Sequence, residues 1–204
     1  MQNIENSVES DLTSLRTLAE AGMSQPLQIG PYLIAGGAWF ASASLLLALA
    51  QLGALPVPEA ILGWVFLIAS AGFAANIFLL IHRDRQSTER GKNRFINATW
   101  SGAGLGIFAF WLSSSVMADR LASPEILSTM SLTVLAIYGL VWWITGVMSE
   151  QSWMKLITVI SFCSMFLVAW FAPTPFGCLS YTAALVACAL VPGVYISRTA
   201  KQTH

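Results

Sequence analysis

The sequence predicts an all-α membrane protein, a polytopic bundle of six transmembrane helices built as three consecutive hairpins, preceded by a short amphipathic helix. The chain of 204 residues is 56% hydrophobic and only 10% charged, whereas soluble domains carry about 25% charged residues. Six apolar stretches each approach the ~20 residues that a helix needs to cross a bilayer. Of the 10 Lys and Arg residues, all except Arg120 lie on one side of these stretches. Lipid is therefore the expected solvent for most of the chain.

Residues 1–30 are expected to form an acidic cytoplasmic helix and a linker. Apolar side chains recur there at the spacing of one stripe on a helix: Ile4, Val8, Leu12, Leu15 and Ala19. Acidic residues outnumber the single Arg16. Three interpretations stay open, namely a solvated tail, a helix that docks on a partner or a second copy through residues 4–23, and a helix at the membrane surface. The negative charge disfavours the last, because interfacial helices usually have a basic polar face.

Residues 31–197 hold the six expected spans, none of which has a charged residue in its interior. Their limits are 33–52, 60–81, 96–116, 127–148, 154–172 and 178–196. Each must be helical, because lipid offers no hydrogen-bond partner to an open backbone. Pro192 falls inside the last span, near its end, where proline bends a helix without having to break it.

The positive residues predict the orientation. They lie in the even-numbered loops and in both tails, which the positive-inside rule places in the cytoplasm. Both termini, including the tail 198–204, are therefore expected on the cytoplasmic side. Tyr32 and Trp153 fit an aromatic belt at that boundary, whereas Trp142 and Trp143 lie deeper and are expected to be packing residues.

The loop 82–95 carries five Lys or Arg residues against two acidic residues. One interpretation is a determinant of topology that also meets anionic headgroups. A second hypothesis adds that the acidic N-terminal helix docks on this loop at Arg83, Arg85 and Arg90, because opposite charges are confined to one membrane face.

Small residues recur at helical spacing within three spans. Gly102 and Gly106 follow Ala98 at intervals of four in the third span, and similar pairs occur at Gly37 and Ala41 and around Gly72. Small residues let helix backbones approach closely in lipid. Packing within the bundle is the expected role, and homodimerisation through Gly102 and Gly106 is the alternative.

Asn76 is the carboxamide that lies well inside a span. An amide in hydrocarbon requires a hydrogen-bond partner. A structural hydrogen bond to another helix is the favoured interpretation, and contact with a transported solute is the alternative.

No motif of an enzyme, cofactor or metal site is recognisable. HExxH, GxSxG and P-loop patterns are absent, and the spans contain no Asp, Glu or His to relay protons. Cys163, Cys178 and Cys188 form no CxxC pair and are expected to be free thiols. We therefore expect no catalytic residue, cofactor or metal, and the formal net charge of zero suggests no nucleic-acid partner.

The N-terminal region resembles a known group of proteins. The run from Asp11 to Gly22, the Pro26-Leu27 pair and the Pro31–Gly37 entry to the first span are similar to small uncharacterised inner-membrane proteins of proteobacteria. The resemblance implies a bacterial cytoplasmic membrane. It implies no activity, cofactor or site residue.

The expected function is that of a non-enzymatic membrane protein that acts through protein interactions, with the N-terminal helix as the contact element and membrane lipids as its surroundings. The alternative is a small solute transporter or channel with a path near Asn76. An intramembrane enzyme is the third class, which the missing motifs disfavour.

Overall fold

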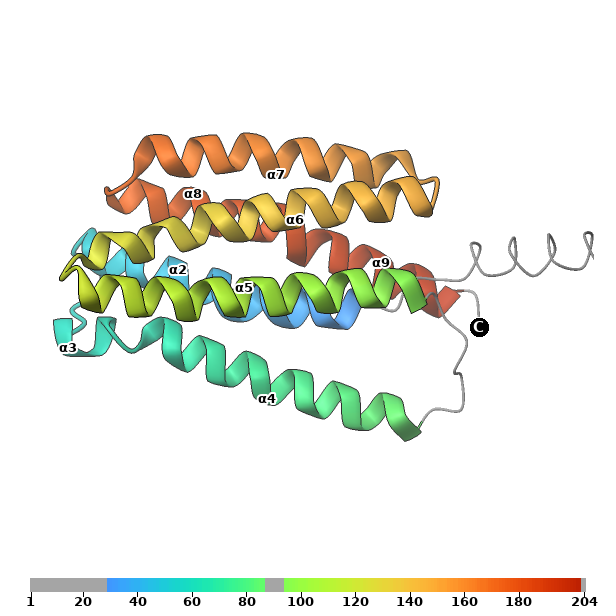
Figure 1. Ribbon diagram of the computed structural model, residues 1–204, viewed down its shortest axis with the longest axis horizontal. Coiled ribbons are helices and arrows are strands. Elements are labelled where there is room, and N and C mark those ends of the chain that lie inside the picture. Colours follow the sequence, from blue (N-terminus) through green and yellow to red (C-terminus); the bar gives the residue numbers. More distant parts are fainter. Residues whose placement is uncertain (1–28, 87–93, 203–204) are drawn as a thin grey trace, which may run out of the picture.

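Every element in the described part of the chain, residues 29–86 and 94–202 of a computed structural model, is helical (Figure 1). The elements are α2 (Gly30–Gln51), α3 (Glu59–Leu62), α4 (Val65–Gln86), α5 (Arg94–Arg120), the 3₁₀ turn η1 (Pro124–Ser128), α6 (Thr129–Met148), α7 (Ser152–Phe171), α8 (Pro175–Leu185), the π-helical turn η2 (Val186–Leu190) and α9 (Val191–Gln202). The all-helical prediction is confirmed for these residues.

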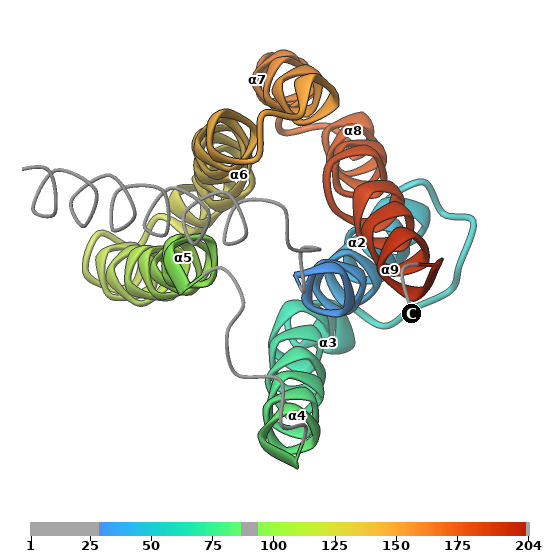
Figure 2. The same cartoon turned by 90° about the vertical axis from the view of Figure 1, so that its right-hand side faces the viewer.

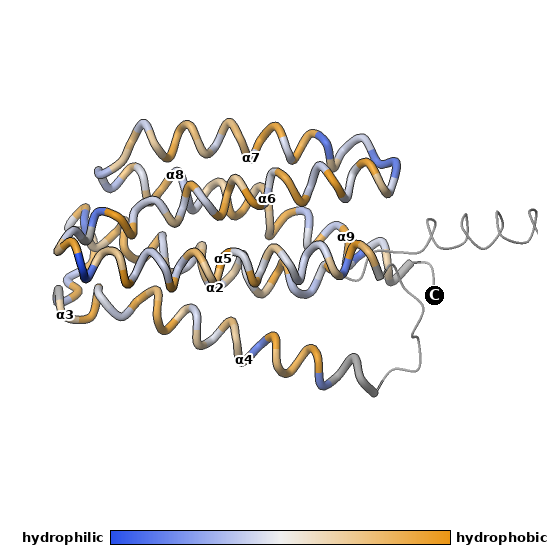
Figure 3. Tube along the Cα trace, viewed as in Figure 1, coloured by the Kyte–Doolittle hydropathy of each residue, from blue (hydrophilic) through white to orange (hydrophobic). Residues whose placement is uncertain are grey.

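Six of the helical segments are long and apolar enough to cross a membrane. They are Gly30–Gln51, Ala60–His82, Phe95–Arg120, Glu125–Met148, Ser152–Phe171 and Pro175–Ala200. Each overlaps one of the spans expected from the sequence. Figure 3 shows apolar positions along the bodies of the helices and hydrophilic positions mostly at the two ends of the bundle. The fold is therefore compatible with a multi-pass membrane protein.

The six segments run up and down in chain order and form an open arc. The start of α2, the start of α5, the turn between α6 and α7 and the end of α9 lie at one end of the bundle (Figure 1). Seen along the helices, the order around the arc is α4, α2, α8 with α9, α7, α6 and α5 (Figure 2). The contacts follow the same order, with α4 packed on α2 and α5 packed on α6 and η1. The consecutive helices α4 and α5 therefore occupy opposite ends of the arc.

Glycines bring α2 and the last span into direct backbone contact. A Cβ atom added to Gly193 would lie 3.0 Å from the carbonyl oxygen of Gly30, and one added to Gly37 would lie 2.8 Å from Cγ of Leu190. Only residues without a side chain allow this approach, which increases dispersion contact between the two helices. The expectation that Gly37 packs within the bundle is confirmed.

The last span changes helical type before its proline. In η2 the N–H of Val191 donates to the carbonyl of Val186, five residues back, and α9 continues through Pro192. Because proline has no N–H, it cannot donate to the Cys188 carbonyl four residues earlier. The indole Nε1–H of Trp142 donates to that oxygen instead, at 2.9 Å. The expectations that Pro192 does not break the helix and that Trp142 packs inside agree with this geometry. The expectation that Trp143 packs inside is wrong, because its side chain is 51% exposed.

Candidate functional site

The small residues of the spans fall into two groups. An added Cβ on Gly72 would lie 2.5 Å from the Trp39 ring, and one on Gly139 would lie 2.8 Å from the ring of Phe162. These glycines hold helices together. An added Cβ on Gly102 or Gly106 would have no neighbour within 4 Å. The expectation of packing within the bundle is therefore wrong for Gly102 and Gly106, as far as residues 29–86 and 94–202 are concerned.

Ala98, Gly102 and Gly106 form an exposed stripe, which we call the α5 glycine face. At about 100° per residue, these positions are turned by about 160° to 240° from Trp100 around the helix axis. The buried residues of α5, which are Ile96, Ser114 and Ala118, lie within about 40° of Trp100. The glycine face therefore points away from the side by which α5 is attached to the bundle.

Trp100 is the main polar and aromatic attachment of α5. Its indole Nε1–H donates to Oγ1 of Thr145 at 3.2 Å, and its ring meets the Trp142 ring edge to face with centroids 5.2 Å apart. Thr145 donates in turn to the carbonyl of Val141 at 2.7 Å. These contacts determine which side of α5 faces α6, and they leave the glycine face open.

The two helices at the ends of the arc are far less buried than the rest. In the most apolar stretch of α5 only 6% of residues are buried, and in that of α4 only 11%, against 28% to 44% in the other four spans. Large side chains such as Leu105 and Phe108 on α5 are 70% and 59% exposed. Exposed apolar surface of this kind faces lipid or another helix in a membrane.

Asn76 is half-buried on α4 and bonds within its own helix. Its Nδ2 donates to the carbonyl of Gly72 at 3.3 Å. The hydrogen bond to another helix that the sequence favours is therefore not formed among the described residues. Two serine hydroxyls of the described residues donate across helices instead: Ser44 donates to the carbonyl of Cys178 at 2.9 Å, and Ser161 donates to that of Leu135 at 2.8 Å. Nothing in the sequence separates these two hydroxyls from the other Ser and Thr side chains of the spans.

The remaining predicted site residues are placed only partly. Arg83 and Arg85 belong to the last turn of α4. Leu12, Leu15 and Arg90 lie outside the described residues, so the docking of the N-terminal helix on the basic loop stays a prediction. Within residues 29–86 and 94–202, His, Cys, Asp and Glu form no group of three suited to a metal ion.

Comparison with known proteins found no match to a protein family, to a curated protein or to a solved structure.

Proposed function

We propose that this protein is a non-catalytic, multi-pass protein of a bacterial cytoplasmic membrane that acts by binding another protein. The six apolar helices support the multi-pass part of the proposal. The bias of Lys and Arg toward one set of loops supports placing both termini in the cytoplasm.

The observation that carries the proposal is the open α5 glycine face. A surface of Ala98, Gly102 and Gly106 lets a second helix backbone approach closely, with gains in dispersion contact. The same residue types elsewhere in the chain, at Gly37 and Gly72, are filled by neighbouring helices. The partner of the glycine face is therefore proposed to be a transmembrane helix of another protein or of a second copy.

The N-terminal helix provides the second proposed contact, on the cytoplasmic side. Its apolar stripe includes Leu12 and Leu15, and a lone helix of this length is only marginally stable in water. It is therefore proposed to dock on a partner through residues 4–23. The two contacts are separable, because one lies in the membrane and the other before the first span.

The test compares what co-purifies with four forms of the protein in mild detergent, measured by mass spectrometry and by size-exclusion chromatography. The forms are the full chain, a deletion of residues 1–24, the double variant Gly102→Ile with Gly106→Ile, and the single variant Gly104→Ile. Gly104 is an apt control, because a Cβ there also has open space while its position lies about 40° from Trp100, off the glycine face.

We expect the double variant to lose a partner or a second copy that Gly104→Ile retains. Loss of a co-purifying protein on deletion of residues 1–24 would assign the cytoplasmic contact to the N-terminal segment. The same partner-free profile in all four forms would contradict the proposal.

A further inference from the structure

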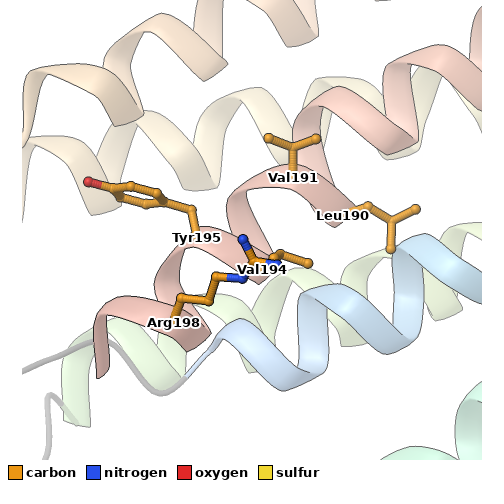
Figure 4. A pocket seen from close by; sticks show the side chains of 5 residues that line it. All are labelled: Leu190, Val191, Val194, Tyr195 and Arg198. Carbon is orange, nitrogen blue, oxygen red and sulfur yellow. The ribbon is translucent and has the colours of Figure 1, made fainter. Parts of the chain in front are cut away.

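A groove of about 370 Å³ runs beside η2 and α9, and Leu190, which packs on Gly37 of α2, forms its border. Its lining residues are Leu190, Val191, Val194, Tyr195 and Arg198 (Figure 4). The positions from Val191 to Arg198 have the spacing that places side chains on one face of a helix. Val191 is 60% and Tyr195 is 56% exposed, so the groove opens toward the surroundings of the bundle.

The groove changes character along its length. Leu190, Val191 and Val194 make one end apolar, and Arg198 makes the other end cationic. In Figure 4 the guanidinium of Arg198 turns back along the helix toward Val194. Arg198 is exposed near the end of α9. Its guanidinium is therefore within reach of a ligand that lies in the groove.

An aromatic pair borders the cationic end. The ring of Tyr195 meets that of Trp153, on α7, edge to face with centroids 5.1 Å apart. This contact holds the Tyr195 ring as a wall of the groove. Tyr and Trp are enriched where a membrane helix meets the headgroups, and Arg198 lies one turn beyond Tyr195, toward the end of the span.

We propose that this groove binds an anionic phospholipid. One acyl chain lies along Leu190, Val191 and Val194, and the phosphate of the headgroup meets the guanidinium of Arg198. The planar guanidinium is suited to two parallel hydrogen bonds with a phosphate. A net anionic headgroup is favoured over a zwitterionic one, in which a quaternary ammonium offsets the charge of the phosphate. An apolar tail joined to an anionic head matches the order of the lining residues, whereas a fully apolar ligand would leave Arg198 without a counterpart.

The test measures lipid retention by native mass spectrometry of the full chain in mild detergent. The probes are phosphatidylglycerol and phosphatidylcholine with the same acyl chains, supplied together. We expect phosphatidylglycerol to be favoured by roughly fivefold, the factor that one cation near a headgroup supplies. In Arg198→Gln this preference disappears. Arg120→Gln is the control, because Arg120 is an exposed cation at the opposite end of the bundle.

A second pair of variants separates the groove from its charge. Val191→Trp fills the apolar end and keeps Arg198, and we expect it to lower the retention of both lipids severalfold. Leu140→Trp adds the same ring at a position on α6 that is 57% exposed, and we expect no change. Equal retention of both lipids by the wild type, or unchanged retention in Arg198→Gln or Val191→Trp, would overturn the proposal.

Retention of phosphatidylglycerol only after deletion of residues 1–24 would also overturn the proposal of a lipid site. That result would make the acidic N-terminal segment the occupant of the groove. The lipid site and the proposed protein contact fail separately, because Gly102→Ile with Gly106→Ile alters a different helix.

Discussion

The indole of Trp142, on α6, donates a hydrogen bond of 2.9 Å to the carbonyl oxygen of Cys188 in the last span. Cys188 precedes Pro192 by four residues. In an ordinary α-helical turn the N–H of residue 192 would donate to the Cys188 carbonyl, but proline has no N–H. Trp142 and Cys188 are both 0% exposed, which leaves water no access to the oxygen. The side chain of one helix thus compensates for a proline in another.

Trp142→Phe should therefore destabilise the fold by about 1–3 kcal/mol, because a buried carbonyl loses its partner. The free energy of unfolding in detergent is the measurement. Pro192→Ala supplies an N–H that can serve the Cys188 carbonyl. In the Pro192→Ala background the same Trp142→Phe change should cost about 1 kcal/mol less. The lost ring volume is the same in both backgrounds, so equal costs would show that the hydrogen bond contributes nothing.

Gly193→Val and Gly102→Val should have opposite outcomes. A side chain at Gly193 meets the carbonyl of Gly30 and the backbone N of Ile34, both at 3.0 Å, and backbone atoms cannot turn aside as a flexible side chain does. We expect a loss of about 3 kcal/mol or more. Gly102→Val enters open space and should stay within about 0.5 kcal/mol of the wild type. Thermal unfolding in detergent distinguishes the two, and a comparable loss at Gly102 would mean that its face is covered.

Ser161→Ala should weaken the contact between α7 and α6. The hydroxyl is 0% exposed and donates to the carbonyl of Leu135 across the two helices at 2.8 Å. Hydrogen bonds between membrane helices contribute about 0.6 kcal/mol on average, and a loss of about that size is expected in the free energy of unfolding. Ser113→Ala is the control, because that hydroxyl is exposed and bonds within its own helix. Equal effects at the two positions would contradict the assignment.

Asn76→Leu should leave the stability unchanged or raise it by about 1 kcal/mol. Its amide bonds only to Gly72 of the same helix among the described residues, and replacing a polar group inside an apolar span with leucine is favourable. A loss of more than about 1 kcal/mol in the unfolding free energy would indicate a partner beyond α4. The same variant, if it folds, also tests the alternative of a solute path beside Asn76, because loss of a solute flux in this variant would support that path.

Reversing Arg83, Arg85 and Arg90 to Glu should expose the N-terminal helix to protease, if that acidic segment docks on the basic loop. Charge reversal replaces attraction by repulsion between the two segments. Each exposed pair contributes roughly 1 kcal/mol or less, so all three changes are made together. Limited proteolysis of intact membranes is the measurement. Protection equal to that of the wild type would rule out the docking.

The glycine pairs illustrate where sequence-based reasoning stops. Gly37 with Ala41 and Gly102 with Gly106 have the same spacing of four residues, and both sit in apolar spans. Gly37 lies against η2 and Ala41 is buried among residues of α8, whereas Gly102 and Gly106 face outward. The spacing predicts that a helix can present a smooth face, but not which neighbour, if any, covers it. Asn76 is a second example. The sequence predicts that its amide needs an acceptor, but not that the acceptor is the Gly72 carbonyl on its own helix.

The sequence by itself determined the all-helical class and the six apolar spans, because hydrophobic length and the absence of interior charge are local properties of the chain. It also placed Pro192 near the end of a helix, but it did not distinguish the buried Trp142 from the exposed Trp143. Only the tertiary structure decided that α4 and α5 end an open arc, that Trp142 serves the Cys188 carbonyl, and that Gly102 and Gly106 are uncovered. These relations join residues far apart in the sequence, and in lipid no difference in hydrophobicity marks which apolar face meets protein and which meets the membrane.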